Sequence, residues 1–328
     1  MLSEPSEPAS DSVRVRYSVV VPVYGNEATL PALIKRLKLI AHDLDAPMEA
    51  VFVVDGSPDG SVLVLRKLLP MSGLPAQLVC HSRNFGAFAA IRTGFAAARG
   101  EYVAAMAADL QEPPELVEKF FKHLSSGEYD VAVGVRTGRD DPLTATMLSK
   151  VFWSNYRRWV HPDIPAGGVD IFGCTKDVAA RLVGLDESHT SLVGLLYWLG
   201  FRRIGIPYQR AARTGGKSGW SFHRKVRYFL DSVFSFTDVP ITVLTSIGVI
   251  GGILTLLASV VVVVARLTGA IRASGYTPIM LVILLSTFTI LFGLGVVGSY
   301  VWRTYENSKG RPGAVPMSHE VFGAVDDH

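Results

Sequence analysis

The predicted fold is decided by one stretch, Tyr102-Val-Ala-Ala-Met-Ala-Ala-Asp-Leu-Gln-Glu-Pro-Pro-Glu115. Its first half is small and apolar, which suits a buried parallel strand packed on both faces. The apolar run stops at Asp109, and Pro114 can then occupy the first turn of a helix. A carboxylate is therefore predicted at the carboxyl end of a central strand, where open α/β sheets bind their ligands. The simpler alternative is a solvated Asp109 that caps the following helix.

Strand-like and helix-like patterns alternate on both sides of this stretch. Alternation at this spacing indicates βαβ units and a parallel sheet. We expect further strands at 13–24, 51–57, 76–80, 130–136, 167–172 and 201–208. We expect helices at 29–44, 61–69, 86–99, 114–124, 143–160 and 175–185.

Composition narrows the class of protein. The 328 residues suffice for one large or two modest domains, and a net charge of +3 gives no general case for binding nucleic acid. Hydrophobic residues make up 49% of the chain, which is apolar for a soluble protein, and the excess lies near the C-terminus. Cys80 and Cys174 lie far apart and form neither a pair nor a metal motif, so we expect reduced thiols in a cytosolic domain.

Two long apolar segments, 241–265 and 277–302, are each long enough to span a bilayer. Basic residues flank the pair on both outer sides, whereas the short loop between them holds two arginines. The positive-inside rule therefore places both flanks in the cytoplasm and predicts a hairpin of two spans in the cell membrane. A buried core hairpin is the alternative.

The segment before the first apolar stretch mixes aromatic residues with His223, Arg224, Lys225 and Arg227. This mixture is typical of a helix that lies in a membrane interface, although a core helix has a similar pattern. The predicted organisation is a disordered tail at 1–12, a cytosolic α/β domain at 13–219, a juxtamembrane amphipathic helix at 220–240, a transmembrane hairpin at 241–302 and a cytosolic tail at 303–328.

Five motifs in this order resemble family 2 glycosyltransferases of the polyprenyl-phosphate hexosyltransferase type, the relatives of dolichol-phosphate mannose synthase and bactoprenol glucosyltransferase. The motifs are Val21-Pro-Val-Tyr-Gly-Asn-Glu27, Val54-Asp-Gly-Ser-Pro-Asp59, Ser82-Arg-Asn-Phe-Gly86, Asp109-Leu-Gln-Glu-Pro-Pro-Glu115 and Arg213-Thr-Gly-Gly-Lys-Ser-Gly-Trp220. The resemblance implies a GT-A fold, which is a Rossmann-like, mostly parallel α/β sheet. It also implies a nucleotide-sugar donor and a lipid phosphate acceptor.

The same resemblance assigns roles to individual residues. It implies that a divalent metal is held by Asp109 and Gln111, and that Asp109, Asp170 and Arg213 are catalytic. Arg213, Lys217 and Ser218 match a loop that closes over the active site. Donor binding falls to Pro22, Tyr24, Glu27, Asp55, Arg83, Asn84 and Asp109. Binding of the acceptor phosphate falls to Arg136, Lys150, Lys217 and Ser218.

Two positions depart from the family pattern. Ala107 replaces the first acid of the Asp-x-Asp metal motif, so the metal has one carboxylate fewer. Val54 replaces the first acid of the usual Asp-Asp-Gly-Ser, so the choice between a uridine and a guanosine donor stays open. The eight histidines show no metal spacing and are interpreted as structural or solvated.

The chemistry explains these residue types. The departing diphosphate gains charge, so a cation such as Mg²⁺ or Mn²⁺ anchored by Asp109 would stabilise it. A phosphate monoester loses its second proton near pH ~6, so the acceptor needs no strong base. Asp170 is therefore given an orienting role first and a base role second. Basic residues are needed because two anions must meet.

The leading hypothesis is an inverting enzyme that makes an undecaprenyl- or dolichyl-phosphate hexose from UDP- or GDP-hexose. Two alternatives remain. The first is a catalytically impaired membrane scaffold that binds a sugar nucleotide, motivated by Ala107 and Val54. The second is a transferase that acts on another lipid or glycan acceptor. A homo-oligomer is compatible with all of them, and no nucleic-acid partner is expected.

Overall fold

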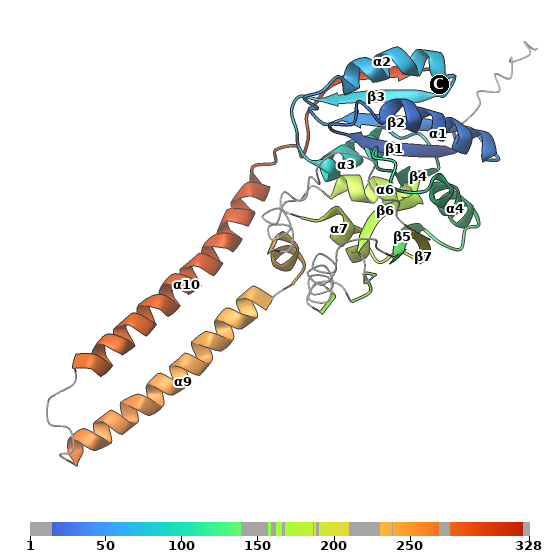
Figure 1. Ribbon diagram of the computed structural model, residues 1–328. Helices are drawn as coiled ribbons and strands as arrows, with labels where there is room; N and C mark the ends of the chain where they lie inside the picture. Colours follow the sequence, from blue (N-terminus) through green and yellow to red (C-terminus); the bar gives the residue numbers. More distant parts are fainter. Residues whose placement is uncertain are drawn as a thin grey trace, which may run out of the picture.

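A mixed sheet forms the centre of the molecule, and two long helices project from its domain (Figure 1). The computed structural model describes residues 15–138, 157–158, 162–165, 168–185, 187, 190–209, 230–237, 239–268 and 276–323. Within these residues the sheet has eight strands in the order β7-β5-β6-β4-β1-β2-β3-β8. The strands are β1 (Tyr17–Val23), β2 (Met48–Val54), β3 (Ala76–His81), β4 (Tyr102–Ala105), β5 (Val131–Gly138), β6 (Val169–Thr175), β7 (Arg203–Gln209) and β8 (Pro316–Phe322).

Strands β1 to β4 form the parallel part of the sheet. β1 pairs in parallel with both β2 and β4, and β2 pairs in parallel with β3. β6 runs antiparallel to β4 and β5, while β5 and β7 are parallel to each other. The predicted strand at the centre is thus confirmed, but it ends at Ala105, four residues before Asp109.

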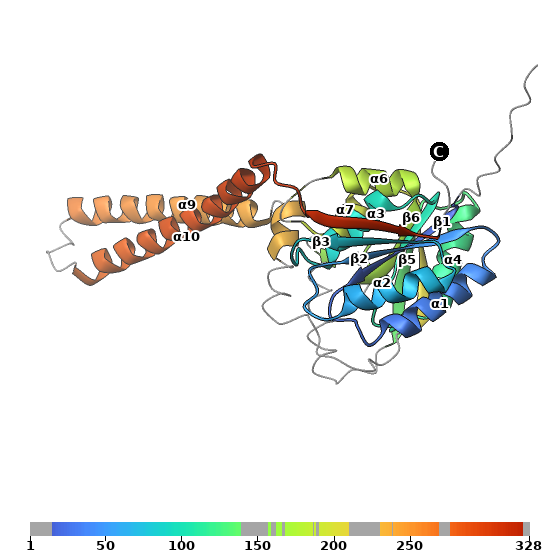
Figure 2. The same ribbon diagram turned by 90° about the horizontal axis from the view of Figure 1, so that it is seen from above.

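Helices cover both faces of the sheet (Figure 2). On one face lie α1 (Leu30–Asp43), α2 (Ser61–Ser72) and α4 (Pro114–Ser125), and on the other α3 (Ala87–Ala97), α6 (Lys176–Gly184) and α7 (Leu192–Trp198). The stripe Leu30, Leu33, Ile34, Leu37 and Ile40 of α1 is buried, as its helical spacing predicts. Gly94 of α3 would place a Cβ only 2.2 Å from Val20 of β1, so glycine allows this helix to lie close to the sheet.

The C-terminal part differs from the predicted tail at 303–328. α9 (Val239–Leu267) and α10 (Tyr276–Ser308) run side by side away from the domain and back, and α10 continues six residues past 302. The chain then enters β8, which pairs antiparallel with β3 at the edge of the sheet. β8 is largely exposed, with Met317 and Val321 more than half exposed, so it lacks the continuous apolar run by which a buried strand is recognised in a sequence.

The predicted pair of membrane spans finds partial support. Among the described residues, one helical stretch, Leu285–Ser308, is long and apolar enough to cross a membrane. A bent pair, Leu230–Phe236 and Val239–Gly251, passes the same test only when its two helices are counted together. The two helices meet at 80°, so the first lies across the entry to α9 and does not extend it.

Candidate active site

The loops that carry the predicted donor-binding residues lie along one edge of the sheet. Register pairs Val23 with Val54 and Val54 with Cys80, so β1, β2 and β3 end at the same level. The loops that follow these strands are therefore neighbours, although they are about thirty residues apart in sequence. This edge is the carboxyl end of the parallel strands, where α/β sheets bind ligands.

Asp55 follows β2 and is buried against the end of β3. Its carboxylate accepts hydrogen bonds from the backbone N–H of Phe85 and Gly86 at 2.8 and 2.7 Å, and it lies 2.8 Å from Nδ1 of His81. Burial alone would raise the pKa of Asp55, but these hydrogen bonds, with the bond from His81 foremost, lower it below its usual range. Asp55 therefore holds the turn formed by residues 82–86, which we name the donor turn.

Arg83 and Asn84 lie on this donor turn, packed against the end of β2. A Cβ on Gly56 would lie 2.4 Å from the backbone of both residues, and Gly56 has a φ of +58°. Only glycine meets both conditions. The Arg83 guanidinium lies 4.0 Å from the centre of the Phe85 ring and donates to the Asn84 carbonyl at 3.1 Å. Arg83 and Asn84, two of the predicted donor-binding residues, are therefore packed closely against Gly56.

Glu27 links the loop after β1 to the loop after β2. Its carboxylate accepts from the Gly60 N–H at 2.9 Å, and its own N–H donates to Asp59 at 3.0 Å. Asp59 also accepts from the Ser57 hydroxyl at 2.6 Å. Burial would raise the pKa of Asp59, but hydrogen bonds, of which the one from Ser57 is the largest, lower it to about 2. Glu27 and Asp59 thus hold the loops after β1 and β2 together.

Pro22 and Tyr24 flank the end of β1. Pro22 lies beyond the residues of β1 that pair with β4, so its missing N–H interrupts no hydrogen bond to that strand. The Tyr24 side chain is 52% exposed and leaves an aromatic ring accessible at the edge of the sheet.

Asp109 lies on the loop after β4. Its carboxylate accepts from the Gln111 N–H at 3.3 Å, around Leu110, whose φ of 61° is the one positive value of a non-glycine residue among those described. Left-handed backbone at a leucine stores strain, which is characteristic of functional turns. The Thr29 hydroxyl donates to the Ala108 carbonyl at 2.7 Å and so ties this loop to the start of α1.

Arg136 and Asp170 contact each other at the ends of β5 and β6. The Arg136 guanidinium donates to the Asp170 carboxylate, which also accepts from the Tyr208 hydroxyl at 3.1 Å. The Arg136 side chain is buried, whereas Asp170 keeps a third of its side chain exposed. The predicted acceptor-binding cation and the predicted catalytic acid therefore act on each other directly, which the sequence did not indicate.

Comparison with known proteins agrees with this architecture. Residues 18–185 match the model of the family described as glycosyl transferase family 2. This range contains the site residues described above, apart from Tyr208 on β7. The chain belongs to glycosyl transferase family 2. The transferase has an α/β, mostly parallel sheet of the GT-A type, as the resemblance implied.

Several relatives cover most of this transferase. An uncharacterized glycosyltransferase of Synechocystis is 30% identical over 301 residues, which is 91% of this chain and 93% of the relative. An undecaprenyl-phosphate 4-deoxy-4-formamido-L-arabinose transferase of Aeromonas hydrophila is 28% identical over 297 residues, covering 90% and 91%. A mannosyltransferase of Pyrobaculum calidifontis, solved with GDP-Man and Mn²⁺, is 18% identical with a TM-score of 0.44 and covers 91% of both chains.

Four predicted site residues of the transferase, Lys150, Arg213, Lys217 and Ser218, lie outside the described residues, and their roles stay predictions. No group of three or more His, Cys, Asp or Glu within the described part of the chain is arranged to hold a metal. The assignment of a metal to Asp109 and Gln111 therefore stays a prediction.

Sequence reasoning missed His81, Asp59 and Thr29, each of which holds a loop of the site. His81 ends the buried strand β3, and a polar residue at such a position needs a partner. That signal was present in the sequence, but it could not identify Asp55 as the partner. Val54, in contrast, is buried in the core, which explains why a valine is tolerated there.

Proposed function

We propose that this glycosyltransferase moves a hexose from a nucleotide-diphosphate sugar to a polyprenyl phosphate at the cytoplasmic face of the cell membrane, with inversion at the anomeric carbon. The observation that carries the proposal is the apolar arm, formed by α9 and α10, that extends from the transferase domain. Relatives named undecaprenyl-phosphate 4-deoxy-4-formamido-L-arabinose transferases, which align over 90% of this chain, support a lipid phosphate acceptor.

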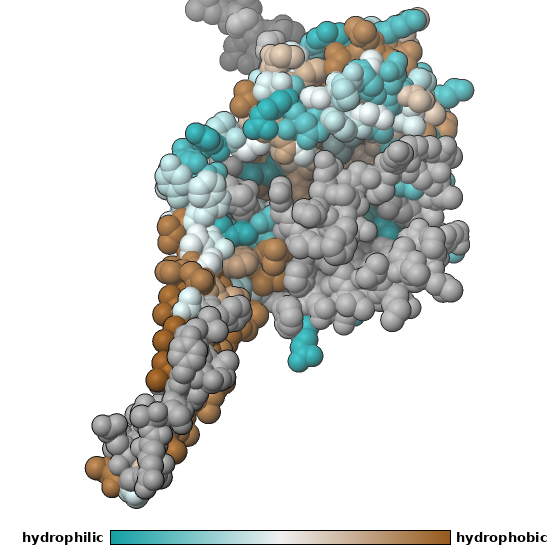
Figure 3. Space-filling model, turned by 60° about the vertical axis from the view of Figure 1, so that its left-hand side comes forward, coloured by the Kyte–Doolittle hydropathy of each residue, from teal (hydrophilic) through white to brown (hydrophobic). Residues whose placement is uncertain are grey.

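The lengths and exposed apolar surface of α9 and α10 support a hairpin of two spans. α9 has 29 residues and α10 has 33, so at about 1.5 Å per residue both exceed a hydrocarbon layer of about 30 Å. Hydrophobic residues run along the arm in Figure 3. Large apolar side chains such as Ile253, Leu257, Leu285 and Leu291 are more than half exposed, which water would disfavour and lipid would not.

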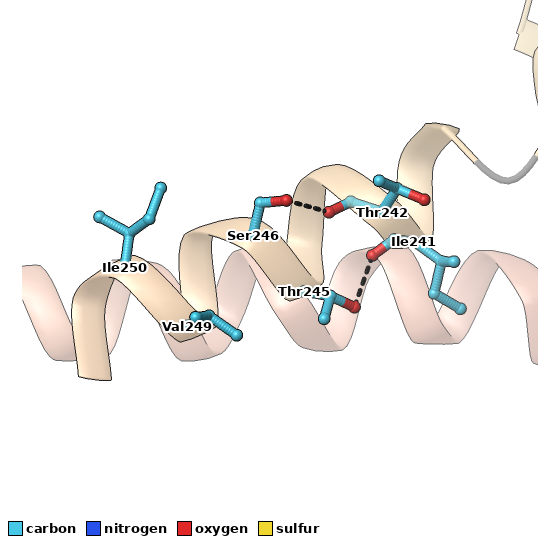
Figure 4. A pocket seen from close by; sticks show the side chains of 6 residues that line it. All are labelled: Ile241, Thr242, Thr245, Ser246, Val249 and Ile250. Carbon is cyan, nitrogen blue, oxygen red and sulfur yellow. Dashed lines mark hydrogen bonds between the residues drawn. The ribbon is translucent and has the colours of Figure 1, made fainter. Parts of the chain in front are cut away.

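A groove on α9 has the same character (Figure 4). It is lined by Ile241, Thr242, Thr245, Ser246, Val249 and Ile250. The hydroxyls of Thr245 and Ser246 donate to the carbonyls of Ile241 and Thr242, both at 2.8 Å. Hydroxyls satisfied within their own helix are compatible with a lipid environment. The groove lies along the arm, away from the ends of the strands, so it is a surface for lipid chains and not the site of transfer.

The foot of the arm carries features of a membrane interface. Trp302 and Tyr305 are both more than half exposed, and the Lys309 ammonium lies 5.3 and 4.3 Å from their ring centres. Aromatic residues and lysine at the end of an apolar helix are typical of the headgroup level. Because α9 leaves the domain and α10 returns to it, both flanks lie on one side of the arm. The basic flanking residues support a cytoplasmic position for that side.

Donor activation is assigned to the loop after β4. When bound, a divalent cation would neutralise the charge that grows on the departing diphosphate. Asp109 would anchor that cation with Gln111 and the donor itself, since the described residues contain no group of three or more His, Cys, Asp or Glu that could hold a metal by themselves. Tyr24, Glu27, Asp55 and the donor turn would hold the nucleotide.

Acceptor binding is assigned to Arg136 and Asp170. Nε of Arg136 is buried and has no hydrogen-bond partner among the described residues, while Nη2 contacts Asp170. A phosphate oxygen would provide the missing acceptor through a charge-assisted hydrogen bond. Asp170 would orient Arg136, and the ionised phosphate would attack the anomeric carbon from the side opposite the diphosphate.

The test is a screen of UDP- and GDP-hexoses with purified full-length protein and a polyprenyl phosphate in detergent. We expect one donor to give a lipid-phosphate hexose whose anomeric configuration is opposite to that of the donor. Turnover restricted to other lipid or glycan acceptors would overturn the acceptor assignment. Nucleotide binding without turnover on any acceptor would favour the scaffold that Ala107 motivated.

A further inference from the structure

The strand that follows the membrane arm, β8, pairs with β3 as far as the residue before the donor turn. β8 pairs with β3 from Phe322 opposite Ala76 to Pro316 opposite His81 (Figure 2). The register shifts between Cys80 and His81, so Met317 is the extra residue of a bulge. A bulge re-aims a strand, and this one keeps β8 paired up to the last residue before the donor turn. Pro316 is tolerated because it begins an edge strand.

Side chains fix this register. The Arg66 guanidinium of α2 donates to the Glu320 carboxylate from both Nε and Nη2, with the shortest distance 2.7 Å. The Gln77 amide nitrogen donates to the Glu49 carboxylate. The Gln77 amide oxygen lies 2.7 Å from Nε2 of His319, and an amide oxygen can only accept. His319 is therefore the donor of that bond. A slip of β8 by one residue would break both contacts.

The chain between α10 and β8 contacts the donor turn directly. The Val315 carbonyl accepts a hydrogen bond from the Ser82 N–H at 3.0 Å. Asp55 holds the far end of the same turn through Phe85 and Gly86. The donor turn is therefore held from two sides, once from inside the sheet and once by a segment that leaves the membrane arm only seven residues earlier, at Ser308.

From these contacts we infer that residues 309–322 are a positioning element of the donor site, so that the seating of α10 in the membrane and the binding of the donor are coupled. The inference rests on the proposed function, in which Arg83 and Asn84 contact the donor. Release of β8 frees Ser82 while Asp55 still holds Phe85, so the donor turn loosens at one end. Donor affinity then falls, whereas the acceptor site at β5 and β6 is unchanged.

The test uses the full-length protein in detergent and two kinds of variant. Glu320→Arg reverses one charge of the pair with Arg66, and the double variant Arg66→Glu with Glu320→Arg restores opposite charges. His319→Pro interrupts the strand itself. For each we would measure the KM of the donor, the KM of the acceptor, kcat and the thermal unfolding midpoint.

We expect Glu320→Arg and His319→Pro to raise the donor KM about threefold to thirtyfold, with the acceptor KM and kcat at saturating donor within about twofold of wild type. The charge-restored double variant should recover the donor KM. A peptide of residues 311–323 added in trans should do the same for His319→Pro, because an extended peptide can add to a free sheet edge.

Three outcomes separate the possibilities. Unchanged donor KM in Glu320→Arg and His319→Pro would overturn the inference and leave the proposed function intact. Equal loss in donor KM, acceptor KM and kcat, without recovery in the double variant, would show a general loss of folding and would also overturn it. A wild-type protein that binds no nucleotide sugar would instead overturn the proposed function itself.

Discussion

His81 Nδ1 lies 2.8 Å from Oδ1 of Asp55, and both side chains are buried beneath the donor turn. The lowered pKa of Asp55 keeps it ionised, so it accepts and His81 donates from Nδ1. Nε2 of His81 lies 2.9 Å from the Thr93 hydroxyl of α3, which completes a chain from β2 through β3 to α3. A motif acid predicted to contact the donor thus also shapes the loop that the donor meets.

We expect His81→Leu to lower the free energy of unfolding by about 1–3 kcal/mol, because it removes a partner from a buried carboxylate. Donor affinity should fall as well, since the donor turn is held by its hydrogen bonds to Asp55. Thr93→Val is the matched control, because it removes the far contact of His81 and leaves Asp55 paired. Nucleotide titration and thermal unfolding would measure both effects, and equal donor affinity in wild type and His81→Leu would contradict the assignment.

Acid should weaken the loops at the edge of the sheet. The pKa of Asp59 is about 2 in the fold and about 3.9 in an unfolded chain, so Asp59 stabilises the fold above about pH 4. This contribution is lost as the pH falls from about 4 toward 2, and the lowered pKa of Asp55 acts with the same sign. Thermal unfolding followed between pH 5 and pH 2.5 should show a smaller decline in Asp59→Asn than in wild type.

Activity should require a divalent cation and Asp109. We expect Asp109→Asn to lower kcat at least about a hundredfold, since a metal supplies several kcal/mol of charge stabilisation. Ala107→Asp should lower the metal concentration needed for half-maximal rate, because ligand charge strengthens the binding of hard cations. Asp177→Asn, an exposed acid on α6, is the control. Turnover that resists chelators would refute the metal assignment.

Arg136→Ala should raise the KM of the lipid phosphate about tenfold to a hundredfold, because a hydrogen bond to a charged group contributes about 1.5–3 kcal/mol. Donor affinity should change little. Arg202→Ala provides the matched control. Arg202 pairs with Asp130 where β7 and β5 begin, whereas Arg136 lies toward the end of β5. Equal acceptor KM values for Arg136→Ala and Arg202→Ala would exclude Arg136 from the acceptor site.

The sequence predicted what local pattern controls. The stripe of α1 follows from helical periodicity, and the strand predicted at 51–57 follows from an apolar run, although β2 spans Met48–Val54. The loop motifs indicated the family. The antiparallel placement of β6 and the pairing of β8 with β3 were not predictable in this way, because both join segments distant in sequence. The Arg136–Asp170 pair depends on that placement of β6, so it too required the structure.

Acceptor delivery by the arm and positioning of the donor turn by β8 can be separated with one truncation and one linker replacement. Ending the chain before Val239 removes the membrane arm and β8 together, whereas a flexible Gly-Ser linker in place of 239–308 removes only the arm. We expect both forms to lose transfer to long polyprenyl phosphates, which need presentation at a membrane.

The linker form should keep wild-type donor affinity and activity on short, water-soluble acceptor analogues, because β8 still holds Ser82. The shorter form should bind the donor more weakly, since its edge of β3 is uncovered. Nucleotide titration and transfer to long and short acceptors would compare the two. Equal donor affinity in both forms would show that β8 has no part in the donor site. Full transfer by the linker form to long polyprenyl phosphates would show that the arm has no part in delivering the acceptor.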